Sequence, residues 1–180
     1  MNIDIIKVGE LKTNCYLVYF ENKKCLIIDP GDFENSIVAR IRKIELEPVG
    51  VITTHNHIDH TGCALSIANI YGVKVYDYDN MFEGINSIDD FTFEVIYTPG
   101  HEEKSICIYF KDYKVMFTGD FIFKDNIGRC DLPTGSFKDM LLSIEKIKEY
   151  DDDITLYPGH GELTNLGYEK ENNMYFNYNK

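Results

Sequence analysis

Histidines are few in this chain, and their positions give the first indication of its chemistry. The 180 residues include five histidines, and three of them fall in the stretch Thr54–His60, directly after the apolar run Val49–Thr53. This stretch has the pattern H-x-H-x-D-H, and its side chains that can bind a metal ion are His55, His57, Asp59 and His60. The remaining histidines each follow a Pro-Gly pair; they are His101 and His160. No histidine is left for another role, which indicates that imidazole serves here as a metal ligand.

A seventh candidate ligand, Asp120, follows Gly119 at the end of another apolar run. Zinc binds imidazole and carboxylate groups, and catalytic zinc sites keep one position open for water or substrate. Five imidazoles and two carboxylates are too many for one tetrahedral ion, but they suit two ions about 3.5–4 Å apart. In an extended segment His55 and His57 point the same way and can bind one ion. We therefore predict two divalent metal ions, zinc in the first place, with iron or manganese as alternatives.

Each of these features also has an ordinary explanation. A histidine after Pro-Gly is commonly a turn residue, and an aspartate after glycine commonly belongs to a turn or a helix cap. The three clustered histidines could belong to a solvated loop. The combination favours metal binding because every candidate ligand comes directly after a predicted strand, and such loops gather at one edge of the sheets in layered α/β folds.

The apolar patterning predicts the elements that position these ligands. The expected strands are 2–8, 14–20, 25–29, 49–53, 73–76, 91–97, 105–110, 114–118 and 154–157. The expected helices are 33–44, with Asp32 as its N-cap, 62–71 and 137–150, and a further helix could form within 163–180. Residues 77–90 are expected to form a loop with a helical turn, and residues 121–136 a functional loop rich in Gly, Pro and Asp.

Composition limits the classes of partner. The length fits one domain, residues 1–180, and the formal net charge of −12 argues against nucleic acid as a substrate. We expect neither a signal peptide nor a membrane span, because the N-terminus lacks the signal pattern and no apolar run reaches the required length. The five scattered cysteines are typical of free thiols, and together these features predict a cytoplasmic protein with a small-molecule substrate. The sequence does not define an oligomeric state.

These motifs together resemble the metallo-β-lactamase superfamily, in order and over nearly the whole chain. Thr54–His60 is similar to the T-H-x-H-x-D-H signature, and further similarities are Asn14–Val18, Asp29–Gly31 and Gly159–Gly161. The resemblance implies an α/β fold, the four-layer αββα sandwich. It assigns His55, His57 and His101 to one metal ion. It assigns Asp59, His60 and His160 to the other ion, with Asp120 bridging the two.

Within the superfamily the chain most resembles short proteins similar to glyoxalase II, the hydroxyacylglutathione hydrolases. The stretch Ile127–Ser136 is similar to their G-R-x-D-x-P-x-G loop, where Arg129 is the candidate substrate-binding residue. A structural salt bridge between Arg129 and Asp131 is an equal alternative.

The resemblance implies hydrolysis of a thioester such as S-lactoylglutathione by a hydroxide that bridges the two metal ions, with Asp59 and Asp120 as catalytic residues. The same fold also hosts hydrolases of lactones, phosphodiesters and β-lactams, a mononuclear iron persulfide dioxygenase, and binding proteins. The chain retains every ligand, which disfavours a binding protein. The candidate second site formed with His60 and His160 disfavours the mononuclear dioxygenase.

Overall fold

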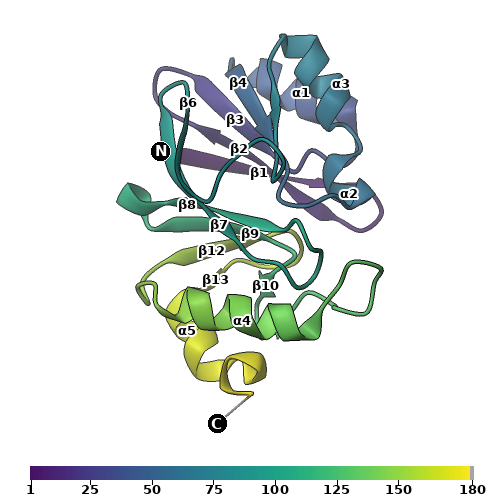
Figure 1. The fold of residues 1–180 in the computed structure, drawn as a ribbon. Coiled ribbons are helices and arrows are strands. Elements are labelled where there is room, and N and C mark those ends of the chain that lie inside the picture. Colours follow the sequence, from purple (N-terminus) through teal and green to yellow (C-terminus); the bar gives the residue numbers. More distant parts are fainter. Residues whose placement is uncertain (179–180) are drawn as a thin grey trace.

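The computed structural model describes residues 1–178 and contains two sheets packed face to face between layers of helices (Figure 1). The first sheet has the order β1-β2-β3-β4-β5, and the second has the order β13-β12-β9-β8-β7-β6. The strands are β1 (Asn2–Val8), β2 (Thr13–Tyr19), β3 (Lys24–Ile28), β4 (Glu47–Ile52), β5 (Val75–Tyr76), β6 (Gly84–Ile88), β7 (Phe91–Tyr97), β8 (Ile106–Phe110), β9 (Val115–Gly119), β10 (Ile122–Phe123), β11 (Asn126–Ile127), β12 (Thr155–Pro158) and β13 (Thr164–Asn165). The helices are α1 (Glu34–Lys43), α2 (Ile58–Thr61), α3 (Ala64–Tyr71), α4 (Phe137–Lys148) and α5 (Leu166–Asn172), with short 3₁₀ turns η1 (Lys111–Tyr113) and η2 (Met174–Asn177).

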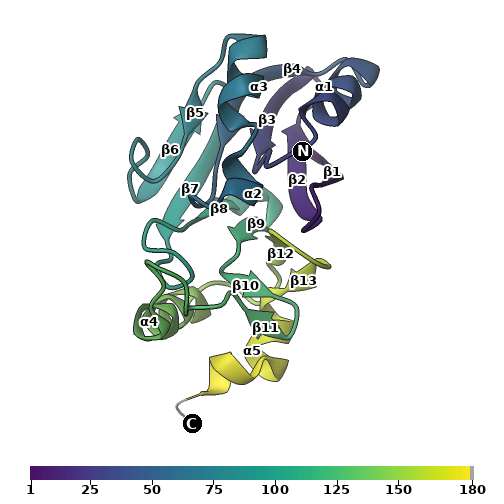
Figure 2. The ribbon, with the colours of Figure 1, turned by 90° about the vertical axis from the view of Figure 1, so that its right-hand side faces the viewer.

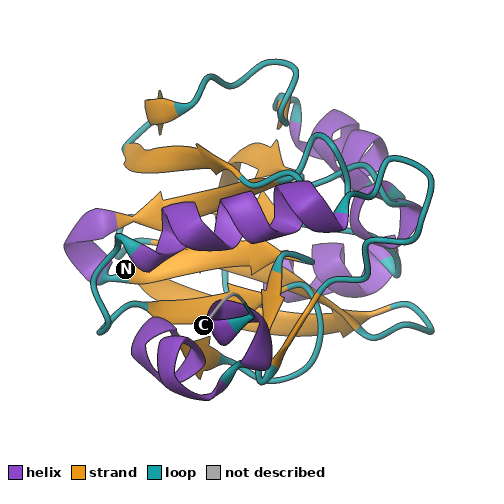
Figure 3. Ribbon diagram, turned by 60° about the horizontal axis from the view of Figure 1, so that its bottom comes forward, coloured by secondary structure: helices purple, strands orange, loops and turns teal. Residues whose placement is uncertain are grey.

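The alternation of side chains along the strands explains the four layers. In β2, Tyr16 and Val18 point into the core between the sheets, whereas Cys15 and Leu17 point outward to the cluster beneath α1 and α3. In β9, Phe117 points into the same central core and Met116 points outward to the cluster beneath α4 and α5. Because both faces of these strands are apolar, each sheet needs a helical layer on its outer side. Figure 3 shows α4 lying across the strands of the second sheet. The predicted αββα sandwich is confirmed.

Parallel pairs in both sheets bring strand ends together. Strands β3 and β4 run parallel, with Ile28 opposite Ile52, and β9 and β12 run parallel in the second sheet. The sheets are also joined directly near these ends, because the backbone N–H of Ile106 donates to the carbonyl of Thr54 at 2.8 Å. A second link runs from the N–H of Asn14 to the carbonyl of Gly159 at 2.7 Å. The loops that carry the predicted ligands therefore leave the sheets at one shared edge.

The structure differs from the predicted elements in several places. The predicted helix 62–71 is α3, which begins at Ala64 and is preceded by the unpredicted single turn α2, and the strand β13 lies within the range of the predicted C-terminal helix. The helix after the turn at residues 29–32 begins at Glu34, and its N-cap is Phe33 in the left-handed region rather than Asp32. The Asp32 carboxylate accepts from the N–H of Phe33 at 2.7 Å, so it stabilises the turn before the helix. Residues 77–90 include the strand β6, whose weak apolar pattern reflects its place at the edge of the sheet. Residues 121–136 include the small hairpin β10–β11. The predicted C-terminal helix is shorter, Leu166–Asn172, and residues 179–180 lie outside the described residues.

Two further expectations concern bonding and membranes. All five cysteines are free thiols, as predicted. Among the described residues, no helix has the length and apolar character that crossing a bilayer requires.

Candidate metal centre

The seven predicted ligands meet where the two sheets join. His55 follows β4, His101 follows β7, and Asp120 follows β9 directly. His160 follows β12, and Asp59 and His60 lie on α2, the single-turn helix that begins after His57. In Figure 2, α2 and the end of β9 face the hairpin β10–β11 across this junction.

Three of the histidines form one group of nitrogen atoms. Nε2 of His55 lies 3.1 Å from Nδ1 of His57, and the same Nδ1 lies 2.9 Å from Nε2 of His101. Three neutral imidazole nitrogens that converge in this way can share one metal ion.

The other two histidines form a second group with a carboxylate. Nε2 of His60 lies 3.3 Å from Nε2 of His160, and Oδ2 of Asp59 lies 3.2 Å from Nε2 of His160. Nε2 of His60 lies 3.4 Å from the same Asp59 oxygen. This group can hold a second ion.

Asp120 lies between the two groups. Its Oδ2 is 3.6 Å from Nε2 of His101 and 3.5 Å from Nε2 of His160, while its Oδ1 is 3.3 Å from Nε2 of His60. Oδ1 is buried and has no hydrogen-bond partner among the described residues. A buried carboxylate oxygen without a hydrogen bond is costly unless a cation is present, so this position of Asp120 fits its predicted contact with metal ions at either group.

The separations of the donor atoms match the size of a metal site. Four donors at zinc–ligand distances of about 2.0–2.1 Å in tetrahedral geometry lie about 3.3–3.4 Å apart. Neighbouring donor atoms of the two groups and of Asp120 lie 2.9–3.6 Å apart, and all donors of one group lie within 4.8 Å of one another. The residues present therefore fit divalent metal ions.

Hydrogen bonds on the far side of three rings fix which nitrogen faces the centre. Nδ1–H of His101 donates to the carbonyl of Arg129 at 2.8 Å, and Nδ1–H of His160 donates to the carbonyl of Leu11 at 3.1 Å. Nδ1 of His60 lies 2.9 Å from Oδ2 of Asp29. Because each of these partners is an acceptor, the proton is assigned to Nδ1 and the Nε2 lone pair is free to bind metal.

Asp29 is a site residue that the sequence analysis did not assign. Its carboxylate is buried and accepts from the N–H and the hydroxyl of Thr54, both at 2.7 Å, in addition to His60. It therefore ties the loop after β4 to the helix α2. Its position in the sequence could have indicated this role, because Asp29 directly follows the strand β3, just as the predicted ligands follow their strands.

The charges of the centre are strongly coupled. Burial works against the charged form of His60, but the surrounding carboxylates, Asp29 first, outweigh it and raise the pKa of His60 well above the ordinary 6.5. Burial and then the nearby His60 lower the pKa of His55. Burial tends to raise the pKa of Asp120, but His60 outweighs it and brings that pKa to about 2. Without metal, a proton on His60 thus offsets part of the negative charge of the carboxylates, and a metal ion would displace that proton.

Glycine at position 159 is required by the close packing of the centre. A Cβ atom built on Gly159 would lie 2.3 Å from Oδ1 of Asp120 and 2.5 Å from Cε1 of His60. Any side chain here would fill the space between two donor groups.

Arg129 is the predicted substrate-binding residue. Its backbone carbonyl supports the centre, because it accepts the hydrogen bond from Nδ1–H of His101. Its guanidinium forms two hydrogen bonds with the carboxylate of Asp131, at 2.7 and 2.8 Å, and both side chains are exposed. The structure thus contains the alternative salt bridge, and a role of Arg129 in substrate binding stays a prediction.

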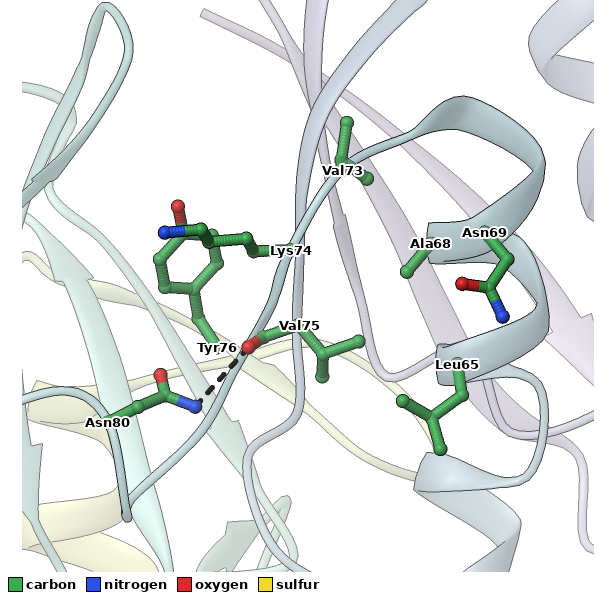
Figure 4. Close-up of a pocket in the computed structure, with 8 residues that line it drawn as sticks. All are labelled: Leu65, Ala68, Asn69, Val73, Lys74, Val75, Tyr76 and Asn80. Carbon is green, nitrogen blue, oxygen red and sulfur yellow. Dashed lines mark hydrogen bonds between the residues drawn. The ribbon is translucent and has the colours of Figure 1, made fainter.

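Two cavities flank the metal centre. One, of about 480 Å³, is lined by Asp59 together with the exposed side chains of Leu11 and Ile58. The other, of about 450 Å³, is lined by His160 and the hairpin β10–β11. A third hollow, of about 420 Å³, lies between α3 and β5 (Figure 4). It contains none of the predicted ligands, and its only charged side chain is Lys74, so it is not a candidate for the catalytic site.

Known proteins are similar to this chain in sequence and in fold. A family model described as the metallo-beta-lactamase superfamily matches residues 8–80 and 82–160. The chain is 32% identical to the hydroxyacylglutathione hydrolase GloC of Haemophilus influenzae, over 98% of this chain and 99% of that protein. It is also similar to the crystal structure of BLEG-1 B3 metallo-beta-lactamase, with a TM-score of 0.92, 28% identity and coverage of 96% and 98% of the two chains. The crystal structure of TTHA1623 in a di-iron-bound form has a TM-score of 0.87, 26% identity and coverage of 94% and 98%.

Proposed function

The chain belongs to the metallo-beta-lactamase superfamily, and we propose that it is a metal-dependent hydrolase of thioesters, with S-lactoylglutathione as the representative substrate. The observation that carries the hydrolase proposal is the convergence of seven donor groups, with separations of 2.9–3.6 Å between neighbouring donor atoms. The choice of a thioester is supported by the similarity to a hydroxyacylglutathione hydrolase along nearly the whole of both chains.

The two groups of donors would hold two divalent ions, one at His55, His57 and His101, and the other at Asp59, His60 and His160. Bound there, such ions polarise a carbonyl and lower the pKa of water toward neutrality. Zinc suits the imidazole-rich donor set, and the di-iron form of TTHA1623 supports iron as the alternative.

Side chains next to the two groups of donors orient and hold the groups that take part in the proposed reaction. Thr13 donates through its hydroxyl to Oδ2 of Asp59 at 3.0 Å, which fixes this carboxylate beside His160. In this proposal Asp59 takes up the proton that the attacking water loses, a role that its contact with Thr13 and His160 supports. Asp120 stays ionised at neutral pH, since its pKa is about 2, and keeps a negative charge between the donor groups. A thiolate leaves easily because thiols have a pKa of about 8.5, so no additional histidine is needed as an acid.

The test combines metal analysis with a substrate panel. We expect the purified protein to contain about two equivalents of zinc, iron or manganese per chain and to hydrolyse S-lactoylglutathione. His57→Ala should lower both metal content and turnover. The matched control is Asn56→Ala, which changes an exposed neighbour in the same stretch. Unchanged metal content and turnover in His57→Ala would show that the proposal is wrong.

β-Lactam hydrolysis is the second candidate, because the chain is 28% identical to BLEG-1, whose crystal structure is described as a B3 metallo-beta-lactamase. Nitrocefin hydrolysis, measured beside the thioester, separates the two. A higher kcat/KM for nitrocefin would favour the second candidate, and lactone, phosphodiester and persulfide substrates complete the panel.

A further inference from the structure

The cavity beside His160 is a candidate binding site for one half of the substrate. Its volume of about 450 Å³ falls within the range of about 300–1,000 Å³ typical of small-molecule sites. It borders the metal centre through His160, whose Nε2 is 3.2 Å from Oδ2 of Asp59. The residues that line it are Phe123, Lys124, Asp125, Asn126, His160, Gly161 and Glu162.

Two side chains of opposite charge line this cavity and contact each other. Nζ of Lys124 donates to Oε2 of Glu162 at 2.9 Å, and the two side chains are 45% and 78% exposed. An exposed ion pair of this kind contributes little to stability, so it opens readily when a ligand offers charges of its own. Lys124 can then bind a carboxylate and Glu162 an ammonium group. Phe123 adds an apolar wall, with its ring 6.2 Å from the ring of His160.

The hairpin that carries Phe123 and Lys124 is held firmly from behind by α5. Glu169 on α5 is fully buried, and its carboxylate accepts from the N–H of Asp125 at 3.0 Å and from the side-chain amide of Asn173 at 2.8 Å. The hydroxyl of Tyr168 donates to the Asp125 carboxylate at 2.8 Å. Figure 2 shows α5 next to the hairpin β10–β11. The cavity wall is therefore preformed, as a specific site requires.

We propose that Lys124 and Glu162 determine substrate specificity, and that the cavity between them and His160 binds the leaving thiol through the opposite charges of a zwitterion. This inference rests on the proposed thioester hydrolysis. It names the thiol as an amino-acid or peptide thiol with a free carboxylate and a free ammonium group, and it places recognition at Lys124 rather than at Arg129, which lies outside this cavity and pairs with Asp131.

Binding and kinetics test the proposal separately. The probe is S-methylglutathione, a zwitterion whose sulfur is blocked, titrated calorimetrically into the metal-loaded protein. Lys124→Gln and Glu162→Gln should each raise its Kd about tenfold, the effect of losing one charge-assisted contact. Lys124→Arg should retain most of the affinity. The control is Lys111→Gln, the same charge change at an exposed residue on η1, at the other end of β9.

In turnover, Lys124→Gln should raise the KM for S-lactoylglutathione about tenfold with little change in kcat. The KM for the uncharged S-lactoyl-N-acetylcysteamine should stay the same, which a general loss of structure would not allow. If the wild type hydrolyses both thioesters and the variants change neither KM nor Kd, the cavity assignment is wrong although the proposed function stands. If S-methylglutathione binding depends on Lys124 but no thioester is hydrolysed, the proposed function is wrong; the cavity then binds a zwitterion, and its assignment to a leaving thiol is wrong as well. Absence of zwitterion binding to the wild type overturns the assignment.

Discussion

Replacing Asp29 by asparagine tests how the protein prepares a metal ligand. The change keeps the size of the side chain, and asparagine also tolerates the left-handed backbone found at Asp29, where φ is 53°. The carboxylate now accepts three hydrogen bonds, two from Thr54 at 2.7 Å and one from His60 at 2.9 Å. An amide has one acceptor oxygen, so in either orientation its NH₂ group faces a donor, either the N–H of Thr54 or Nδ1–H of His60.

The imidazole of His60 can relieve this conflict by moving its proton to Nε2. Nε2 is the nitrogen that lies 3.3 Å from His160 and from Asp120, so the lone pair intended for the metal is then lost. Loss of a partner of a metal-binding histidine typically weakens metal affinity about 10- to 100-fold, and we expect the upper end because the tautomer is inverted. The buried, charged hydrogen bond contributes about 2 kcal/mol, and the metal-free variant should lose this much of its free energy of unfolding.

The assay is a competition titration with a chromophoric chelator, which resolves the affinities of the two sites, followed by urea unfolding of the metal-free protein. Asp4→Asn is the matched control, since Asp4 pairs with Arg40 on α1 and is not a candidate ligand. Wild-type affinity at both sites in Asp29→Asn would refute the claim that Asp29 sets the tautomer of His60.

Three other predictions follow from the same centre and its supports. Gly159→Ala should lower metal content and reduce turnover at least tenfold, because its Cβ would lie 2.3 Å from Oδ1 of Asp120. The control Gly72→Ala has open space around its Cβ; its left-handed φ of 67° should lower stability, but metal content and turnover of the folded protein should stay the same. Elemental analysis and the thioester assay measure both. In EDTA, the raised pKa of His60 contributes stability that is fully present below its unfolded value of 6.5 and is lost as the pH rises through the folded-state value. The melting temperature of the metal-free protein should therefore fall as the pH is raised above 6.5, and an unchanged melting temperature would contradict this. Glu169→Gln should cost about 1–3 kcal/mol in urea unfolding, since an amide cannot accept all the hydrogen bonds of the buried carboxylate; a loss below 0.5 kcal/mol would contradict it.

The positions of the ligands could be predicted because their signals are local. Each of His55, His101, Asp120 and His160 follows an apolar run, and the rule that such ends gather at one edge of the sheets needs no knowledge of the pairing. The αββα layers could also be anticipated, through the resemblance of the motifs, and the alternation along β2 and β9 accounts for them physically.

The supports of the centre could not be predicted because they depend on tertiary neighbours. Asp29 in an Asp-Pro-Gly turn looks like any turn aspartate, and its role appears only when β3 and β4 pair in parallel and bring it beside Thr54. The hairpin β10–β11 has two-residue strands, too short for a periodic pattern. Glu169 looks like a solvated helix residue, and its burial depends on the hairpin, more than forty positions earlier in the chain.

The most direct test of the two-metal assignment is a crystal structure of the metal-loaded protein with diffraction data collected above and below the absorption edge of the bound metal. We predict two anomalous peaks, one among His55, His57 and His101 and one among Asp59, His60 and His160, with Asp120 in contact with both. A single peak, or peaks away from these donor atoms, would contradict the assignment.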